Sequence, residues 1–571
     1  MPCQMRGAVG CAIWAKLASL CHATKLNPCL IAAQQLAKMR RKVSLLIAAL
    51  AAPLFGQTYF PAPPSPLDNP PSAAKELLGM ALFWEEQLSH ADTVSCGTCH
   101  SFRTGGGDGR LAVHPGIDGL LGTADDIRGS RGVLRRNGPS AFAVDAAMGV
   151  AQQVTRRKAP SVINAGYSTM LFYDGRARSL EELALVPLLN HVEMGFIGRT
   201  EADLVQKVQQ SRPLALAANV PQRLQTFIQG QSYATLFAQA FGSGGITGTR
   251  IAKALASYLR TLNSDQSKYD HYLAGQVALS AEEARGLFLF ERSGANATSA
   301  AACSQCHGDI SPASHSAGPT FENLTPYGTP QQHNNFHNTG VRPIAEDAGR
   351  SQGTFKVPLL RNVALRAPFM HNGSLLDLVA VLDFYSRGGD FHQNQAPEVQ
   401  PIQLTVSERT ALLSFLNTLT DPRVQNELPP FDRPLLQSER NVSATIFGTS
   451  MTSGALVSVR LMAEGPAFLG KPAFVIGVAG IEPFQPAFLL LDVAGNPAGS
   501  TINGLNCWLG LTPALAPIFA GLSLTTANLV LSIPNQPLLV GSTLYAQWVV
   551  ADSRASTGLV TSDALALVIL P

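Results

Sequence analysis

Two copies of a short cysteine and histidine motif carry the clearest chemistry in this 571-residue sequence. The motif is CxxCH, and its members are Cys96, Cys99, His100, Cys303, Cys306 and His307. Two thiols on one helical turn can each add to a vinyl group of the same haem, and the adjacent histidine is then held beneath the iron. The spacing therefore predicts two covalently bound haem c groups, with His100 and His307 as the proximal iron ligands.

A redox-active CxxC pair, or half of a zinc site, is the alternative interpretation of each motif. Both copies carry the histidine, however, and an exported chain would otherwise keep four reactive thiols in an oxidising compartment. Cys507 belongs to neither motif, and we expect it to be a small buried apolar side chain.

Export is indicated by residues 1–56, which contain basic side chains and no acidic one. From Met39 the segment has a positive start (MRRK), an apolar run over 43–55, and Gly56 at a plausible cleavage point. The apolar run is too short to span a bilayer, which takes about 20 residues. We therefore expect an N-terminal extension and signal peptide over 1–56, no transmembrane anchor after cleavage, and a periplasmic or secreted protein. An uncleaved membrane anchor is the alternative.

Composition excludes other classes of protein. Only 14% of residues are charged, with 42 Lys and Arg against 39 Asp and Glu, and 46% are hydrophobic. A nucleic-acid-binding protein would show a strong basic excess, and a disordered chain would be less hydrophobic. We therefore expect a multidomain globular protein with no nucleic-acid partner.

Helical patterns surround both motifs. Ser72 is an N-cap residue ahead of AAKELLGMALFWEEQL, and amphipathic stretches follow between Leu180 and Leu262. Ser280 and Glu283 have capping-box spacing ahead of ARGLFLFE, which leads to the second motif. The sequence thus predicts two mostly α-helical c-type cytochrome domains, a first one over 57–275 and a second one over 276–430.

The composition changes after Pro429. Short apolar runs such as AFVIGVAGI, AFLLLDVAG, ANLVLSI, STLYAQWVVAD and ALALVIL are separated by Gly, Pro, Asn and Ser. Their lengths and turn residues are typical of strands. Residues 431–571 are therefore expected to form an all-β, sandwich-like domain, whose role the sequence does not indicate.

Several motifs around the CxxCH sites occur together in one known family. The run KAPSVINAGYSTMLFYDGRARSLEELALVPLLNHVEMG follows the first site, and FHNTGV, FKVPLLRNVALRAPFMHNGS and LDFYSRGG follow the second. Over residues 72–425 the chain resembles the bacterial dihaem cytochrome c peroxidases, a family that includes the MauG-type enzymes. The resemblance implies that hydrogen peroxide reacts at one haem while the other relays electrons into it.

The resemblance also implies roles for three side chains between the sites. Glu193, in HVEMG, matches the family's distal glutamate, and an apolar pocket would raise its proton affinity for transfer to the departing oxygen. Arg176, in YDGRA, would pair either with a haem propionate or in a surface salt bridge. Tyr173 replaces the tryptophan that usually stands between the haems, and Leu183 replaces a distal glutamine, which makes the pocket drier.

The sequence offers more than one candidate for the sixth ligand of the irons. Aligning LDFYSRGG with the family places Tyr385 where the peroxidases have methionine and the MauG-type enzymes have tyrosine, and Met370 in PFMHNG competes with it. His114 follows the first motif and would either cap that haem or be a loop histidine.

A family calcium ion between the haems is put in question by the residues at its position. Lys158 occupies the place of an asparagine that helps to bind this ion, and an ammonium would repel calcium or replace its charge. Three acidic residues after His114 could offer oxygen ligands elsewhere, but their spacing matches no EF-hand. They are Asp118, Asp125 and Asp126.

Together these features predict a dihaem peroxidase that reduces hydrogen peroxide with electrons from a small donor protein, either a cytochrome c or a cupredoxin. Electrons would enter at the His307 haem, pass Tyr173 and meet peroxide at the His100 haem beside Glu193. One alternative is a MauG-type oxidase acting on a protein or organic substrate. Another is an electron-transfer cytochrome without turnover.

Overall fold

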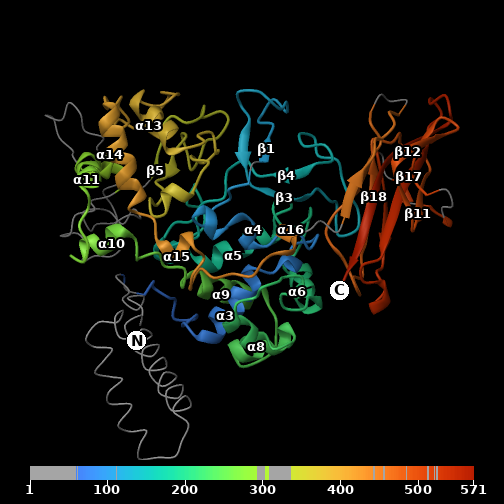
Figure 1. Cartoon of the computed structure of the whole chain (residues 1–571), viewed down its shortest axis with the longest axis horizontal. Coiled ribbons are helices and arrows are strands. Elements are labelled where there is room, and N and C mark those ends of the chain that lie inside the picture. The colour runs from blue at the N-terminus through green and yellow to red at the C-terminus, as the bar shows by residue number, and fades with distance from the viewer. Residues whose placement is uncertain are drawn as a thin grey trace, which may run out of the picture. The chain divides into compact units, whose positions relative to one another are not determined.

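The computed structural model describes residues 60–571 except 61, 111, 292–302, 308–335, 441–443, 454–456, 484, 511–513, 520 and 523–524. The signal peptide expected over 1–56 lies outside these described residues. Within them, no helix is long and apolar enough to cross a membrane. Figure 1 follows the chain from helices in blue and green to a β-rich final part in red.

Helices around one apolar core form most of the first domain. Helix α3 (Ala73–Phe83) begins after Ser72, whose side chain accepts the Lys75 N–H, as predicted. It meets α9 (Gly248–Leu259) so closely that a Cβ on Gly79 would lie 1.9 Å from the Ala254 carbonyl oxygen. The other helices are α4 (Cys96–Cys99), α5 (Leu180–Leu189), α6 (Glu201–Gln210), α7 (Gln222–Ile228), α8 (Tyr233–Phe241) and α10 (Lys268–Leu273).

Two short strand pairs interrupt this mostly helical domain. Strands β1 (Ala112–His114) and β2 (Ile127–Gly129) are antiparallel, as are β3 (Arg131–Leu134) and β4 (Gln152–Val154). These strands matter for function because β3 passes directly beneath the segment that carries Glu193. A Cβ on Gly132 of β3 would lie 1.9 Å from the Val192 carbonyl oxygen, so glycine permits the contact.

The second domain is a smaller helical unit. The predicted capping box is present before α11 (Ala281–Glu291), with Ser280 and Glu283 exchanging hydrogen bonds of 2.7 and 3.2 Å. Gly286 lets α11 approach α14 (Val406–Asn417), where a Cβ would lie 2.0 Å from the Ala411 carbonyl oxygen. Its other elements are α12 (Ser304–His307), α13 (Leu378–Ser386), α15 (Pro422–Gln425), β5 (Phe336–His337) and β6 (Phe355–Lys356).

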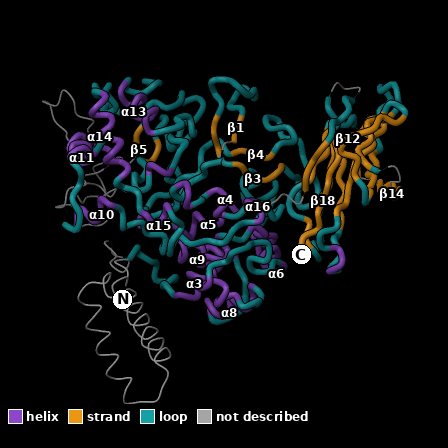
Figure 2. The backbone as a smooth tube through the Cα atoms, in the orientation of Figure 1, coloured by secondary structure: helices purple, strands orange, loops and turns teal. Residues whose placement is uncertain are grey.

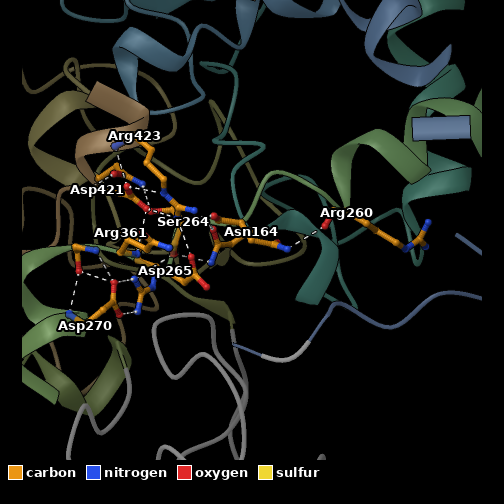
Figure 3. Close-up of polar contacts among 12 residues, drawn as sticks. Asn164, Arg260, Ser264, Asp265, Asp270, Arg361, Asp421 and Arg423 are labelled. Carbon is orange, nitrogen blue, oxygen red and sulfur yellow. Dashed lines mark hydrogen bonds and ion pairs between the residues drawn. The ribbon is translucent and has the colours of Figure 1, made fainter. Parts of the chain in front are cut away.

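Buried charges fasten the end of the first domain to the second, as Figure 3 shows. Arg361 is 1% exposed and donates to both carboxylate oxygens of Asp270, at 2.8 and 2.6 Å. Arg423 donates to Asp265 at 2.7 Å. Removing one partner of a buried ion pair costs ~3–5 kcal/mol, so these pairs hold residues 264–270 firmly against the second domain.

The final part of the chain is rich in strands, as predicted. It contains two sheets around a common apolar core, and their strand pairs are antiparallel except that of β9 with β18, which is parallel. Figure 2 shows its strands gathered in orange beyond α16 (Gln437–Arg440). One sheet has the order β15-β16-β10-β8, and the other has the order β14-β11-β17-β18-β7, with β9 beside β18. The strands are β7 (Ala444–Phe447), β8 (Arg460–Ala463), β9 (Ala467–Phe468), β10 (Phe474–Ala479), β11 (Ala487–Asp492), β14 (Ala514–Phe519), β15 (Gly521–Leu522), β16 (Thr526–Leu531), β17 (Thr543–Ala551) and β18 (Leu559–Leu570).

Cys507 lies outside this sandwich core, on the two-stranded ribbon of β12 (Gly495–Ile502) and β13 (Leu505–Leu509). It is only partly buried, so the expectation of a buried side chain is wrong. The reason is that a ribbon of two strands covers its side chains less completely than a sandwich does.

The β domain packs against the segment that follows β3. Leu134 and Phe142 form a buried apolar cluster with residues of the β domain, Val475 among them. The buried Glu464 accepts the Leu134 N–H at 2.7 Å and pairs with Arg136 at 3.4 Å. The β domain thus supports the strand on which the Glu193 segment rests.

Candidate functional site

The first CxxCH motif forms a single capped turn, α4. Ser95 and Thr98 exchange side-chain and backbone hydrogen bonds in a capping box, which places Cys96 and Cys99 on one turn of helix. Both thiols are free of disulfides. The adjacent His100 has its ring Nδ1 3.1 Å from the Gly106 carbonyl oxygen. Because a carbonyl only accepts, Nδ1 must donate, and Nε2 keeps the lone pair that an iron ligand needs.

The second motif repeats this arrangement. Cys303 directly precedes the turn α12 and Cys306 lies within it, and neither forms a disulfide. Nδ1 of His307 lies 3.1 Å from the Pro358 carbonyl oxygen. Burial lowers the pKa of His307 to about 4, so its imidazole is neutral at physiological pH. Both motifs therefore present two thiols and a neutral imidazole with a free Nε2, which is the donor set of a c-type haem.

A cavity of about 570 Å³ opens beside the first motif. Its volume lies within the ~300–1,000 Å³ typical of ligand pockets. Phe83, Leu183 and Leu259 line it with apolar surface, and His100 and Glu193 also face it. The cavity, the two thiols and the available Nε2 fit a covalently attached haem, whose proximal ligand would be His100.

Glu193 reaches this cavity from a turn that follows α5. The N–H groups of Glu193, Met194 and Gly195 all donate to the Asn190 carbonyl, at 3.1, 3.1 and 2.7 Å, which fixes the turn. Burial raises the pKa of Glu193 to about 7, and Arg176 opposes this shift. The carboxyl can therefore both accept and release a proton near neutral pH.

Tyr173 lies where the two helical domains meet. Its carbonyl accepts the Lys356 N–H at 2.7 Å, and its ring centroid is 6.3 Å from that of His371. His371 is buried and stacks on Phe355 with 3.7 Å between ring centroids. Burial raises the pKa of Tyr173 to about 12, so the phenol is protonated and must lose its proton when it is oxidised.

Tyr385, on α13, is the candidate ligand that the structure brings near the second motif. Burial raises the pKa of its phenol, and the Cys306 and Cys303 thiols add to this effect, which places the side chain close to both. Met370 is half-buried in a turn with φ of 69°, where its carbonyl accepts the Gly373 N–H at 3.3 Å.

His114 and Arg176 both line the cavity of the first motif. His114 Nδ1 accepts the Gly116 N–H at 3.1 Å, which places the ring proton on Nε2. This tautomer is the opposite of the one that ligates iron through Nε2. Arg176 pairs with Asp174 at 2.9 Å and covers the Phe172 ring at 3.5 Å.

The family's calcium ion does not fit the residues at its expected position. Lys158 Nζ donates to the carbonyl oxygens of Arg366 and Pro368, so N–H donors stand where calcium would require oxygen ligands. In the acidic turn, Asp125 accepts the Ile117 N–H and Asp126 accepts the Gly122 N–H. No group of three or more His, Cys, Asp or Glu within the described residues could hold a metal ion.

Arg157 is the participant that the sequence analysis missed. Its guanidinium donates to Asp347 at 2.7 and 2.6 Å and to Asp174 at 2.8 Å. It thereby ties the turn after Tyr173 to the second domain. The basic run at 156–158 was the available signal, but its partner Asp347 lies 190 positions further along the chain.

Comparisons with known proteins relate this chain to dihaem proteins. The family model "Di-haem cytochrome c peroxidase" matches residues 73–278. The methylamine utilization protein MauG of Methylorubrum extorquens is 30% identical over 368 residues, which cover 62% of this chain and 81% of that protein. The cytochrome c551 peroxidase of Nitrosomonas europaea is 27% identical over 405 residues, which cover 70% and 95%. A solved MauG-like protein associated with microbial copper homeostasis is 28% identical, covers 67% and 98%, and gives a TM-score of 0.48.

Two CxxCH turns, each with a histidine whose Nδ1 lies 3.1 Å from a backbone carbonyl oxygen, supply the protein ligands that a dihaem redox protein needs. The chain belongs to the di-haem cytochrome c peroxidase family, whose members include MauG. At the level of this family it is an oxidoreductase that acts on peroxide.

Proposed function

We propose that this chain is a periplasmic or secreted dihaem peroxidase that reduces hydrogen peroxide to water with electrons from a small redox protein. The observation that carries the proposal is Glu193, whose pKa of about 7 places it in both protonation states inside the cavity of the first motif. Family membership supports the reaction class, and the apolar run over 43–55 supports export.

Glu193 is the residue that we assign to proton transfer. Reduction of H₂O₂ to two waters consumes two electrons and two protons. In addition, one proton must move from one oxygen of the peroxide to the other, which departs. The carboxylate form of Glu193 accepts that proton and returns it to the departing oxygen, which leaves as water. Leu183 and Phe83 contribute apolar lining to the same cavity.

The bound haems would supply the metal at which peroxide is cleaved and the storage of one electron each. His100 and His307 would hold them, each through Nε2. Tyr173 and His371 occupy the boundary between the domains that hold the two sites, and we assign Tyr173 to electron passage across it. Tyr385 would help to hold the iron at the His307 site.

Steady-state peroxide consumption by the holoprotein with reduced cytochrome c or a reduced cupredoxin tests the proposal. We expect turnover with at least one of these donors, and its loss in Glu193→Gln with unchanged haem absorption. A holoprotein with both haems that consumes no peroxide with either donor would contradict the peroxidase and support the electron-transfer cytochrome.

A MauG-type oxidase is the second candidate, and Tyr385 favours it. A phenolate is a hard anionic donor that stabilises oxidised iron, whereas a methionine thioether stabilises reduced iron. The two candidates differ in where the oxidising power of peroxide goes. Peroxide-dependent oxidation of an organic or protein substrate, without net oxidation of the added donor, would support the oxidase.

A further inference from the structure

Lys158 is a buried lysine of the first domain that is bonded to the second. Its exposed fraction is 5%, and Nζ donates to the carbonyl oxygens of Arg366 and Pro368 at 2.5 and 2.6 Å. Its backbone N–H donates to the His371 carbonyl at 2.7 Å. Three hydrogen bonds from one residue therefore end on a single short segment, residues 366–371.

This segment places the aromatic side chains at the boundary. His371 ends it, stacks on Phe355 and faces Tyr173. The next residue, Asn372, accepts the Arg128 N–H of the first domain through its carbonyl, at 2.9 Å. Lys158 thus holds the backbone from which His371 approaches Tyr173.

The side chain of Lys158 performs the bonding that a bound cation would perform at this point. A calcium ion takes six to eight oxygen ligands, backbone carbonyls among them. Here the Arg366 and Pro368 carbonyls accept hydrogen bonds from the amine of Lys158. Lys158 stands where the family has an asparagine that offers calcium an oxygen ligand, and it offers N–H donors instead.

The hydrogen bonds from Lys158 to the Arg366 and Pro368 carbonyls do not depend on the charge of the amine. Burial, and secondly Arg366, lower the pKa of Lys158 to about 7, while Asp108 opposes this shift. An ammonium has three N–H donors and a neutral amine has two, so either form can serve both carbonyls. The position is therefore closed to calcium on both sides of neutral pH.

We propose that the side chain of Lys158 replaces a calcium ion as the link between the two helical domains, so that this chain aligns its haem sites without calcium. The inference rests on the dihaem peroxidase proposed above. Lys158 acts as a positioning residue, because it reaches Tyr173 only through residues 366–371.

The first test is the calcium content of the holoprotein. The protein is equilibrated with calcium chloride, desalted and analysed for calcium, and its thermal unfolding is compared with and without EDTA. We expect far less than one calcium ion per chain and an unfolding midpoint that EDTA does not change. One ion per chain, whose removal lowers the midpoint by several degrees, would overturn the proposal.

The second test restores the family's oxygen ligand. Lys158→Asn should bind calcium, unfold at a higher temperature when calcium is added, and lose about tenfold in kcat when EDTA removes the ion. Lys158→Met should lose about tenfold in kcat, with an unchanged KM for peroxide and no response to calcium.

Lys356→Asn is the matched control, because Lys356 Nζ also bonds across the boundary, to Ser168 Oγ at 2.7 Å and to the Met170 carbonyl at 3.0 Å. We expect no calcium response from it. An unfolding midpoint of Lys158→Asn that is as insensitive to calcium as this control would refute the proposal. If Lys158→Asn does not fold, the calcium content of the unaltered protein decides. Neither calcium content nor unfolding requires peroxide turnover, so a failure here is distinct from a failure of the proposed function.

Discussion

Glu193→Gln removes the ionisable group of the cavity with little change of shape. General acid–base groups contribute ~10²–10⁴-fold, so the second-order rate constant for peroxide should fall about 100-fold or more. The pKa of about 7 also sets a pH profile for the unaltered protein. The carboxylate fraction rises from about one tenth at pH 6 to about nine tenths at pH 8. Because the carboxylate accepts the first proton, the rate constant should rise about tenfold over this range, and Glu193→Gln should show no such inflection.

Glu193→Gln, which lowers the rate constant, should raise the free energy of unfolding above pH 7. The folded-state pKa of Glu193 lies above its ordinary value of 4.5, so the folded chain retains a proton between pH 4.5 and about 7 that the unfolded chain releases. The unaltered protein therefore loses stability as pH rises through this window. Glutamine carries no such proton, so above pH 7 Glu193→Gln should be more stable, by ~3 kcal/mol at most.

Stopped-flow mixing with peroxide between pH 5 and 9, together with urea unfolding at pH 5 and 8, measures both effects. Glu182→Gln is the control, because Glu182 lies on the same helix α5 and its carboxylate accepts the Arg178 N–H at 2.7 Å. A Glu193→Gln protein that keeps the inflection near pH 7, or that reacts as fast as the control, would refute the assigned role.

Three further predictions concern the electron path, the second iron and the β domain. Tyr173→Phe should slow electron transfer between the haems about tenfold or more, and Tyr173→Trp should restore the rate. Stopped-flow absorption measures this rate, and equal rates in the unaltered protein and both variants would exclude this path. Tyr385→Met should add the near-infrared band of a methionine-ligated ferric haem and raise the reduction potential of the His307 haem. If the unaltered protein already shows this band, its ligand is a methionine. Glu464→Leu leaves the buried Arg136 without its carboxylate partner and should lower the free energy of unfolding by ~3–5 kcal/mol. Urea unfolding measures this difference, and a loss below about 1 kcal/mol would show that the contact contributes little.

Features that depend on neighbouring residues could be predicted from the sequence. The cap at Ser72, the capping box of Ser280 and Glu283, and the two thiols of α4 each involve side chains within a few positions of one another. The runs in the final domain became strands β10, β11, β16, β17 and β18 because their apolar residues and turn punctuation favour strands locally.

Contacts between distant segments could not be predicted in this way. The bonds of Arg157 to Asp347, of Lys158 to Pro368 and of Glu464 to the Leu134 N–H join residues 190 or more positions apart. Their partners are selected by the folding of the whole chain, and no local pattern records them. Glu193 could be found only through the family motif, because its own spacing is that of an ordinary glutamate at the end of a helix.

The central claim is that two haems in one chain deliver their electrons to one peroxide beside Glu193. Anaerobic titration of the fully reduced holoprotein with hydrogen peroxide, followed by haem absorption, measures this most directly. We expect both haems of a chain to be oxidised by a single equivalent of peroxide. Oxidation of only one haem, or a requirement for two equivalents of peroxide, would contradict the account.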